Sequence, residues 1–214
     1  MAQIHPAPAS IMVEIRPYRA SDLDTIYDIC LATGDAGADA SHLYRDPRLL
    51  GHVYAGPYGV HSPDTAFVAE NEDGVGGYIL GPADTGAFEE TLEALWWPAL
   101  RARYPDPSDP KTPDERLQRL IHHPARMPRR IVDAYPAHLH IDLLPRLQGR
   151  GLGRRMIERW LASVAALGAR GAHLSVGVRN ARAVRFYRAF GFREVERYAA
   201  PFDVIVFGIG IGAF

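Results

Sequence analysis

The 214-residue chain has few of the residues that build disulfide, zinc or nucleotide-binding frameworks. Its single cysteine, Cys30, excludes an internal disulfide and a cysteine-rich zinc site. We expect Cys30 to be a small buried residue of the core. Lys111 is the only lysine, and no Gly-Lys-Ser or Gly-Lys-Thr triplet exists, which excludes a P-loop.

A long apolar run is also missing. The longest such stretch, Val204 to Phe214, contains three glycines and is too short to span a bilayer. Residues 1–10 carry no basic segment followed by an apolar one, so we expect no secretory signal. We expect a cytoplasmic protein without a membrane partner, in which residues 1–10 form a disordered tail and residues 11–214 form one domain.

The charges are unevenly distributed along the chain, although its net charge is only −1. The segment from Arg146 to Arg197 holds twelve arginines and three acidic residues, so it carries +9 and the remainder −10. This segregation predicts a polyanionic ligand on that half, either a phosphorylated cofactor or a nucleic acid. The aromatic residues are not interleaved with the arginines as base stacking requires, so we expect no nucleic-acid partner.

The periodicity of apolar residues predicts an α/β protein. Strands are predicted over residues 11–16, 65–70, 75–80, 137–144, 173–178, 193–198 and 203–209. Helices are predicted over residues 21–33, 47–53, 88–103, 114–121, 151–167 and 181–190. This order predicts a mixed, twisted sheet of about seven strands with helices on both faces, in which residues 82–136 form a helical insertion between two strands.

A glycine-rich turn, Gln148-Gly149-Arg150-Gly151-Leu152-Gly153, follows one predicted strand and opens a predicted helix. Backbone N–H groups at a helix N-terminus bind phosphate, and the helix dipole favours the negative charge. The turn differs from the dinucleotide fingerprint, because Arg154 occupies the position of the third glycine. We predict a pyrophosphate site here; the structural alternative is a turn that merely packs closely.

A second motif runs from Asn180 to Phe192. Asn180 is a helix N-cap residue, and Ala183 and Tyr187 lie four residues apart on one helix face. Gly191 stands where a helix ends in the left-handed conformation. The alternative for Tyr187 is an ordinary core tyrosine.

In this order, the two motifs resemble those of the GNAT superfamily of acetyl-CoA-dependent N-acetyltransferases, over about residues 137 to 192. The resemblance implies the GNAT fold, acetyl-CoA as cofactor, and direct transfer of its acetyl group to a primary amine. The residues that it implies for cofactor binding are Leu143, Leu144, Gln148, Gly149, Arg150, Gly151, Leu152, Gly153, Arg154, Asn180, Ala183 and Tyr187.

The same resemblance implies two catalytic residues. Tyr187 would lie near the cofactor sulfur and protonate the departing thiolate. Asp142 is our candidate for the base, because it shares one face of its strand with His138 and His140. Many relatives use a glutamate further up this strand, where this chain has Ala137. The alternative for Asp142 is a buried aspartate that hydrogen-bonds the neighbouring backbone.

A more extensive resemblance is to the acetyltransferase-like C-terminal domain of the eukaryotic O-GlcNAc hydrolases. It is carried by Ile15-Arg16-Pro17-Tyr18, Ile26-Tyr27-Asp28-Ile29-Cys30, Glu72-Asp73-Gly74 through Gly77-Tyr78, Trp97-Pro98 with Tyr104, Ile141-Asp142 and Pro201-Phe202-Asp203-Val204. The chain has no room for the hydrolase, so we expect a stand-alone, bacterial-type relative. The eukaryotic copies depart from the glycine-rich loop, so the alternative function is an acetyl-CoA-binding or interaction module without turnover.

Other groups of residues give weaker indications of a functional site. His122-His123 and His138-x-His140 lack a carboxylate at ligand spacing, so we expect no metal. Trp96 and Trp97 lie on a predicted helix of the insertion, where we expect Trp97 in the core and one of the pair at the acceptor cleft. A peptide lysine, an aminosugar and a small polyamine all remain open as acceptors, as does the oligomeric state.

Overall fold

The computed structural model describes residues 12–199 and 203–212. The tail predicted over residues 1–10 lies outside the described residues, as do Pro201 and Phe202.

In the described residues, eight strands form two four-stranded sheets, which confirms the predicted α/β class. The first sheet has the order β1-β2-β3-β5, with strands Glu14–Pro17, Phe67–Asn71, Gly74–Leu80 and His140–Leu143. The second has the order β4-β6-β8-β7, with strands Ala137–His138, Gly171–Gly177, Val204–Gly210 and Arg193–Tyr198. Among the described strand pairs, β4 and β6 alone are parallel, so the strand arrangement is mixed.

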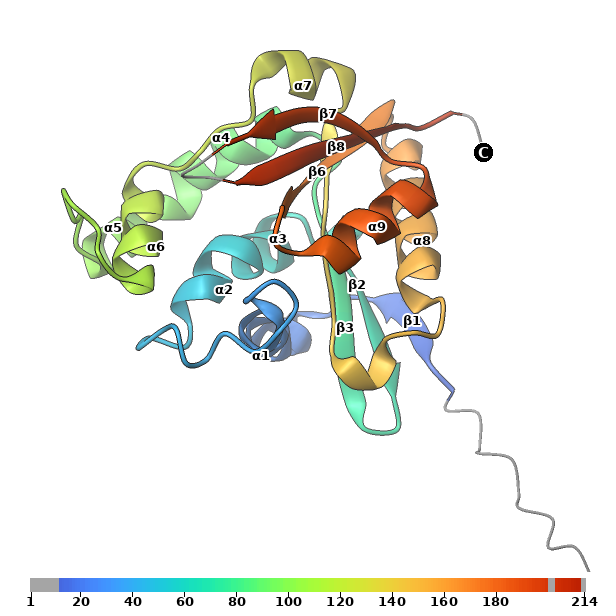
Figure 1. The fold of residues 1–214 in the computed structure, drawn as a ribbon, viewed down its shortest axis with the longest axis horizontal. Helices are drawn as coiled ribbons and strands as arrows, with labels where there is room; N and C mark the ends of the chain where they lie inside the picture. The colour runs from blue at the N-terminus through green and yellow to red at the C-terminus, as the bar shows by residue number, and fades with distance from the viewer. Residues whose placement is uncertain (1–11, 200–202, 213–214) are drawn as a thin grey trace, which may run out of the picture.

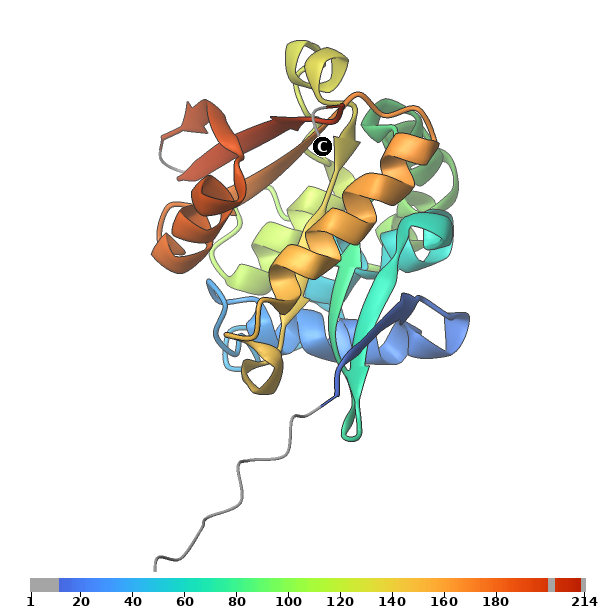
Figure 2. The same cartoon turned by 90° about the vertical axis from the view of Figure 1, so that its right-hand side faces the viewer.

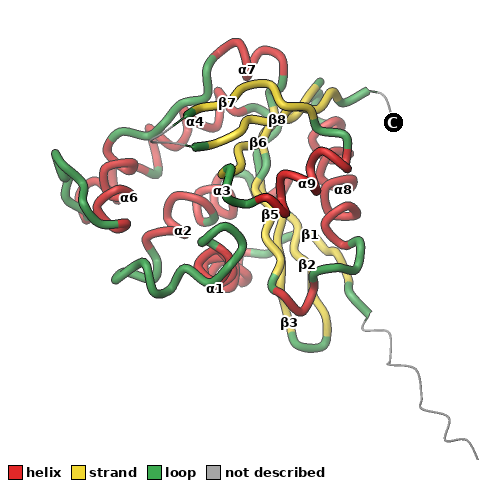
Figure 3. The backbone as a smooth tube through the Cα atoms, in the orientation of Figure 1, coloured by secondary structure: helices red, strands yellow, loops and turns green. Residues whose placement is uncertain are grey.

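The prediction of a single strand over residues 137–144 is wrong, because this segment changes partner at Leu139. β4 pairs with β6, and the N–H of Leu139 still donates to the carbonyl of His173 at 3.3 Å. Beyond that point β5 pairs with β3, while β6 pairs with β8 along its whole length. Strands β5 and β6 therefore diverge, and Figure 3 shows β5 running between the group β1–β3 and the group β6–β8.

Nine helices occur in the described part of the chain. Their bounds are α1 Leu23–Thr33, α2 Leu49–Tyr54, α3 Gly56–His61, α4 Thr85–Leu95, α5 Trp97–Arg103, α6 Pro113–His122, α7 Arg129–Ala134, α8 Leu152–Ala166 and α9 Ala181–Phe190. Helices α4–α7 lie between β3 and β4 in the chain, where the sequence predicts a helical insertion; α4–α6 gather at one end of the molecule, and α7 lies beside β7 (Figure 1). The helix predicted over residues 88–103 is two helices that meet at Trp96, because Pro98 lies in the first turn of α5 and cannot continue α4.

Two hydrophobic cores cover opposite faces of the first sheet. On β3, Ile79 packs into the core of α8, while Tyr78 and Leu80 pack into the core of α1–α6, as strand alternation requires. Figure 2 shows α8 lying across one face of the strands. Helices on both faces are therefore confirmed. Cys30 is buried in the α1 core, as expected.

A buried ion pair connects β1 to the beginning of α1. Both terminal nitrogens of Arg16 donate to the carboxylate of Asp22, at 2.7 and 2.9 Å, and its Nε donates to Glu70 at 2.6 Å. The guanidinium of Arg16 is the main reason why the pKa of Asp22 lies below its usual range. This contact holds α1 against the sheet, and the loop that follows α1 reaches the candidate site.

We predict that Arg16→Met destabilises the fold by about 3–5 kcal/mol, because it leaves the carboxylate of Asp22 buried without a counter-charge. Urea unfolding at neutral pH measures this loss. The double variant Arg16→Met/Asp22→Leu should regain most of it, because neither charge is then buried. Since the folded-state pKa of Asp22 is lowered, the wild-type advantage should fade as pH drops through that pKa. A pH-independent loss would contradict this account.

Candidate functional site

The glycine-rich turn adopts the conformation that an anion-binding helix N-terminus needs. Gly149 and Gly151 have φ of 76° and 70°, and a Cβ at either position would meet no other atom within 4 Å. Backbone conformation, rather than lack of space, therefore calls for glycine at these two positions. Gly151 is the N-cap of α8, and no side chain caps that helix, so the amides of its first turn are open to a ligand.

The close-packing alternative holds at Gly153 alone. A Cβ there would lie 3.2 Å from Cζ of Phe186, so this glycine allows α8 to approach α9 closely. The motif therefore combines two glycines that shape the turn with a third that allows helix packing.

The side chain of Gln148 connects the three elements around this turn. Its Nε2 donates to the carbonyl of Leu143 at 2.7 Å, and its Oε1 accepts a hydrogen bond from Arg182. The end of β5 is thereby tied to the first turn of α9.

The backbone of β5 presents alternate residues to the opening between the two sheets. The N–H of Leu144 donates to the carbonyl of Gly76 at 2.8 Å, so Leu144 belongs to the ladder with β3. In an antiparallel pair, alternate residues direct their N–H and C=O groups away from the partner. Ile141 and Leu143 are the residues that do so here, toward the opening. The structure thus agrees with the predicted position for Leu143 and places Leu144 elsewhere.

Helix α9 forms the opposite wall of this opening. The side chain of Asn180 accepts the N–H of Ala183 at 3.0 Å, which confirms Asn180 as the N-cap. Gly191 ends the helix with φ of 121°, as predicted. The ring of Tyr187 is buried between Phe192 and Phe207. Burial, with a smaller contribution from the nearby carboxylate of Asp142, raises the pKa of the Tyr187 phenol.

These elements enclose a pocket of about 440 Å³. Among the predicted residues, it is lined by Asp142, Leu143, Gln148, Gly149, Gly151, Leu152, Gly153, Arg154, Asn180, Ala183 and Tyr187. Leu144 and the exposed Arg150 are not part of the lining. Arg154 and Arg182 bring the positive charge of the segment 146–197 to the pocket.

Sequence reasoning missed six of the lining residues: Thr33, Ala36, Gly37, Ile141, Arg182 and Phe186. Ala36 and Gly37 follow α1 and both have positive φ, of 52° and 95°. The sequence Gly34-Asp35-Ala36-Gly37 indicates a tight turn, but nothing local indicates that this turn faces α9. The salt bridge of Arg179 with Asp35, at 3.6 Å, joins the two sides.

Asp142 lies at the junction of this pocket with α1. Its Oδ2 accepts the hydroxyl of the fully buried Tyr78 at 2.6 Å. Burial raises the pKa of Asp142, and the hydrogen bond from Tyr78 partly opposes the shift. As predicted, His140 lies on the same face of β5 as Asp142. Its Nε2 is 2.9 Å from the hydroxyl of Tyr58. The alternative role expected for Asp142 involves backbone partners, whereas the partner found is a side chain.

Other candidate features lie apart from this pocket. His122 bonds the carbonyl of Tyr104 at 2.9 Å, and His123 bonds Asp106 at 2.8 Å. Within residues 12–199 and 203–212, no group of three or more His, Cys, Asp or Glu side chains is arranged to hold a metal. None of the described helices combines the length and the apolar character needed to cross a membrane.

Comparison with known proteins gives consistent matches. The model of the acetyltransferase (GNAT) domain matches residues 127–194. The O-GlcNAcase of Rattus norvegicus is 28% identical over 205 residues, which cover 94% of this chain and 22% of that protein. The chain therefore spans about a fifth of the length of the curated relatives that it matches.

Solved structures extend these matches over nearly the whole chain. The crystal structure of SsHAT is 41% identical, covers 94% of this chain and 98% of its own, and superposes with a TM-score of 0.86. A Salmonella typhimurium structure solved with its cofactor acetyl-CoA is 15% identical, with coverage of 94% and 95% and a TM-score of 0.53. At that identity the second likeness shows the fold alone.

Proposed function

The chain belongs to the GNAT acetyltransferase family, and from this we propose that it transfers the acetyl group of acetyl-CoA to a primary amine. The observation that carries the proposal is the pocket of about 440 Å³, which joins an uncapped helix N-terminus to a free strand edge and a buried phenol. A long ligand with phosphates at one end and a thioester at the other matches this order of groups. A cytoplasmic location and the absence of a nucleic-acid partner belong to the same proposal.

The phosphate end of the ligand is assigned to the beginning of α8. The amides between Gly149 and Gly153 are open there, and the helix dipole adds a partial positive charge. The guanidinium groups of Arg154 and Arg182 supply full charges at the same pocket. Both effects favour the pyrophosphate of coenzyme A.

The arm between phosphate and sulfur is assigned to the opening between β5 and α9. An amide-containing chain that enters the opening can pair with the N–H and C=O groups of Ile141 and with the N–H of Leu143, as an added strand does. Gln148 holds the end of β5 in place for this contact, and Ala183 lines the facing wall.

Tyr187 is assigned as the proton donor to the departing thiolate. The raised pKa keeps the phenol protonated at neutral pH, so it can donate a hydrogen bond to the departing thiolate. In the transfer, the amine nitrogen bonds the acetyl carbon, the carbon–sulfur bond breaks, and the sulfur takes the proton of Tyr187 as the phenol takes another from solvent. No free phenolate forms in this step, because burial disfavours it.

Asp142 is assigned as the base that takes the proton released by the amine, directly or through a water molecule. It lines the same pocket as Tyr187 and lies close enough to influence its pKa. A raised pKa makes this carboxylate a better base than an exposed aspartate.

We predict that acetyl-CoA stabilises the wild-type protein and that Gly151→Asp abolishes this effect. A ligand bound only to the native state adds roughly 2.7 kcal/mol at a hundredfold excess over its Kd. The variant places a negative charge beside the phosphates. Thermal shift with millimolar acetyl-CoA measures the effect. Gly168→Asp is the matched control, because Gly168 also has positive φ, of 90°, but is exposed at the other end of α8. Absence of any shift in wild type would overturn the cofactor assignment.

We predict that Tyr187→Phe lowers kcat by about 10- to 1000-fold and leaves the Kd of acetyl-CoA unchanged. The phenylalanine ring keeps the packing with Phe192 and Phe207, so only the donor to the thiolate is lost. Steady-state kinetics with release of free thiol, together with calorimetric titration of acetyl-CoA, separate the two quantities. Wild-type turnover in the variant would show that Tyr187 is a packing residue. Acetyl-CoA binding by wild type without turnover on any amine would support the binding-module alternative.

We predict that Asp142→Asn is at least as stable as wild type at neutral pH and turns over more slowly. Because the folded-state pKa of Asp142 is raised, ionisation above that pKa weakens the fold, and the asparagine variant avoids this cost. The stability difference should vanish below about pH 4, where the wild-type carboxyl is protonated in the unfolded chain as well. Urea unfolding across pH and pH–rate profiles measure both effects, and the rate loss should ease as pH rises. An unchanged pH–rate profile would remove Asp142 from the mechanism.

A further inference from the structure

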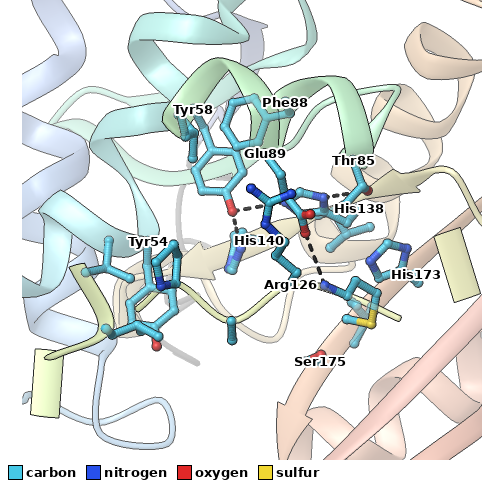
Figure 4. Close-up of a pocket in the computed structure, with 18 of the residues that line it drawn as sticks. Tyr54, Tyr58, Thr85, Phe88, Glu89, Arg126, His138, His140, His173 and Ser175 are labelled. Carbon is cyan, nitrogen blue, oxygen red and sulfur yellow. Dashed lines mark hydrogen bonds between the residues drawn. The ribbon is translucent and has the colours of Figure 1, made fainter. Parts of the chain in front are cut away.

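A second cavity, of about 260 Å³, adjoins the divergent strands next to the acetyl-CoA pocket. It is lined by β5 and β6 together with α2, α3, α4 and residues 124–127 of the insertion. His140 lines this cavity, and the next residue, Ile141, lines the first pocket, so neighbouring residues of β5 contribute to both spaces. Figure 4 shows the aromatic rings of Tyr54, Tyr58 and Phe88 in the wall.

A chain of hydrogen bonds in this wall has only one consistent direction. The hydroxyl of Thr85 donates to the carbonyl of Pro136 at 2.7 Å, so it accepts from Nδ1 of His138 at 2.8 Å. The Nε2 of a neutral His138 is then an acceptor for the hydroxyl of Tyr58, at 3.0 Å. Tyr58 in turn accepts from Nε2 of His140 at 2.9 Å. The Nδ1 of His140 is left with an unshared electron pair.

Both imidazoles are neutral, as this direction requires. Burial lowers the pKa of His138 well below its usual value and lowers that of His140 to about 4. Within residues 12–199 and 203–212, no hydrogen bond reaches Nδ1 of His140, and this atom is not among the buried atoms that lack a partner. The cavity wall therefore presents a hydrogen-bond acceptor that stays unprotonated at neutral pH.

Of the two carboxylates in the cavity lining, Glu89 has an oxygen without a described donor. Oε1 of Glu89 accepts the N–H of Met127 at 3.1 Å, and no described residue donates to its other oxygen. Glu93 also lines the cavity, but both of its oxygens are bound by Arg101. Arg126, the one cationic side chain in the lining, is exposed, and it lies close enough to Glu89 to lower the pKa of that carboxyl, which burial raises.

We propose that this cavity binds the acceptor as a primary amine on an unbranched apolar chain, with Glu89 attracting the ammonium and Nδ1 of His140 orienting the attacking nitrogen. The aromatic wall accommodates the apolar chain and favours a cation near its rings. A histidine with a pKa of about 4 is too weak a base to keep the proton of an amine, so His140 orients the nitrogen by accepting a hydrogen bond. The inference rests on the proposed function, because it supplies the acceptor for that reaction. A small alkylamine and a lysine side chain share this chemistry.

The test measures amine binding without turnover, in protein saturated with coenzyme A. The probes are n-pentylamine and an N-acetyl-lysine amide peptide, titrated by calorimetry. His140→Gln retains a nitrogen donor toward Tyr58 and removes the acceptor at Nδ1, and Glu89→Gln removes the charge. Each variant should weaken binding of the preferred probe by about 10-fold or more, with the Kd of coenzyme A unchanged.

His52→Asn is the matched control. His52 lies on α2, has its pKa lowered to about 4 by burial, and bonds a tyrosine, Tyr27, at 2.9 Å, but it is not part of the cavity lining. Asparagine retains a polar atom near the position of Nδ1, so amine binding should stay at the wild-type level.

The outcomes separate this inference from the proposed function. Tighter binding of pentylamine identifies a small-molecule acceptor, and tighter binding of the peptide identifies a lysine side chain; either supports the inference when both variants weaken it. Wild-type affinity for both probes in His140→Gln and Glu89→Gln would overturn it, even if acetyl transfer were intact. No binding of either probe to wild type, or loss of coenzyme A binding in the variants, would also overturn it. Failure of wild type to bind coenzyme A would contradict the proposed function, and amine titration of the free protein would then decide the inference.

Discussion

The divergence of β5 from β6 after Leu139 is the constraint on which the rest of the site depends. Beyond Leu139, β5 pairs with β3 and β6 pairs with β8, and in the described residues the edges of β5 and β6 that face the opening have no strand partner. The opening exposes the backbone edge of Ile141 and Leu143 on one side and the imidazole of His140 on the other. Buried backbone groups need partners, so an edge of this kind favours a ligand rich in amides.

The two spaces at this opening have opposite electrostatic character, although they share one strand. The first pocket combines an uncapped helix N-terminus with Arg154 and Arg182, which suits an anion. The second combines Glu89 with a neutral His140, which suits a cation. Burial raises the pKa of Tyr187 and of Asp142, which both line the first pocket. The two proposed ligands thus have opposite charges, although the chain itself has almost no net charge.

Local sequence signals predicted the parts of the site that local forces determine. The glycine-rich turn before α8, the cap at Asn180 and the alternation of His140 with Ile141 all follow from residue type and spacing. Long-range pairing determines what was missed. The break at Leu139 depends on the pairing of β5 with β3 and of β6 with β8, and Ala36 and Gly37 reach the pocket because α1 packs against β3 and β5. Helices α3 and α7, six residues each, are too short to show a clear period.

Residue-resolved hydrogen exchange of the β5 amides, with and without coenzyme A, tests the central claim most directly. In the free protein, the amide of Leu144, which bonds Gly76, should exchange slowly, whereas the amides of Ile141 and Leu143 should exchange quickly because they face the opening. Coenzyme A should slow the exchange of Ile141 and Leu143 and leave that of Leu144 nearly unchanged. Equal protection of neighbouring β5 amides in the free protein, or no response of Leu143 to saturating coenzyme A, would contradict the account.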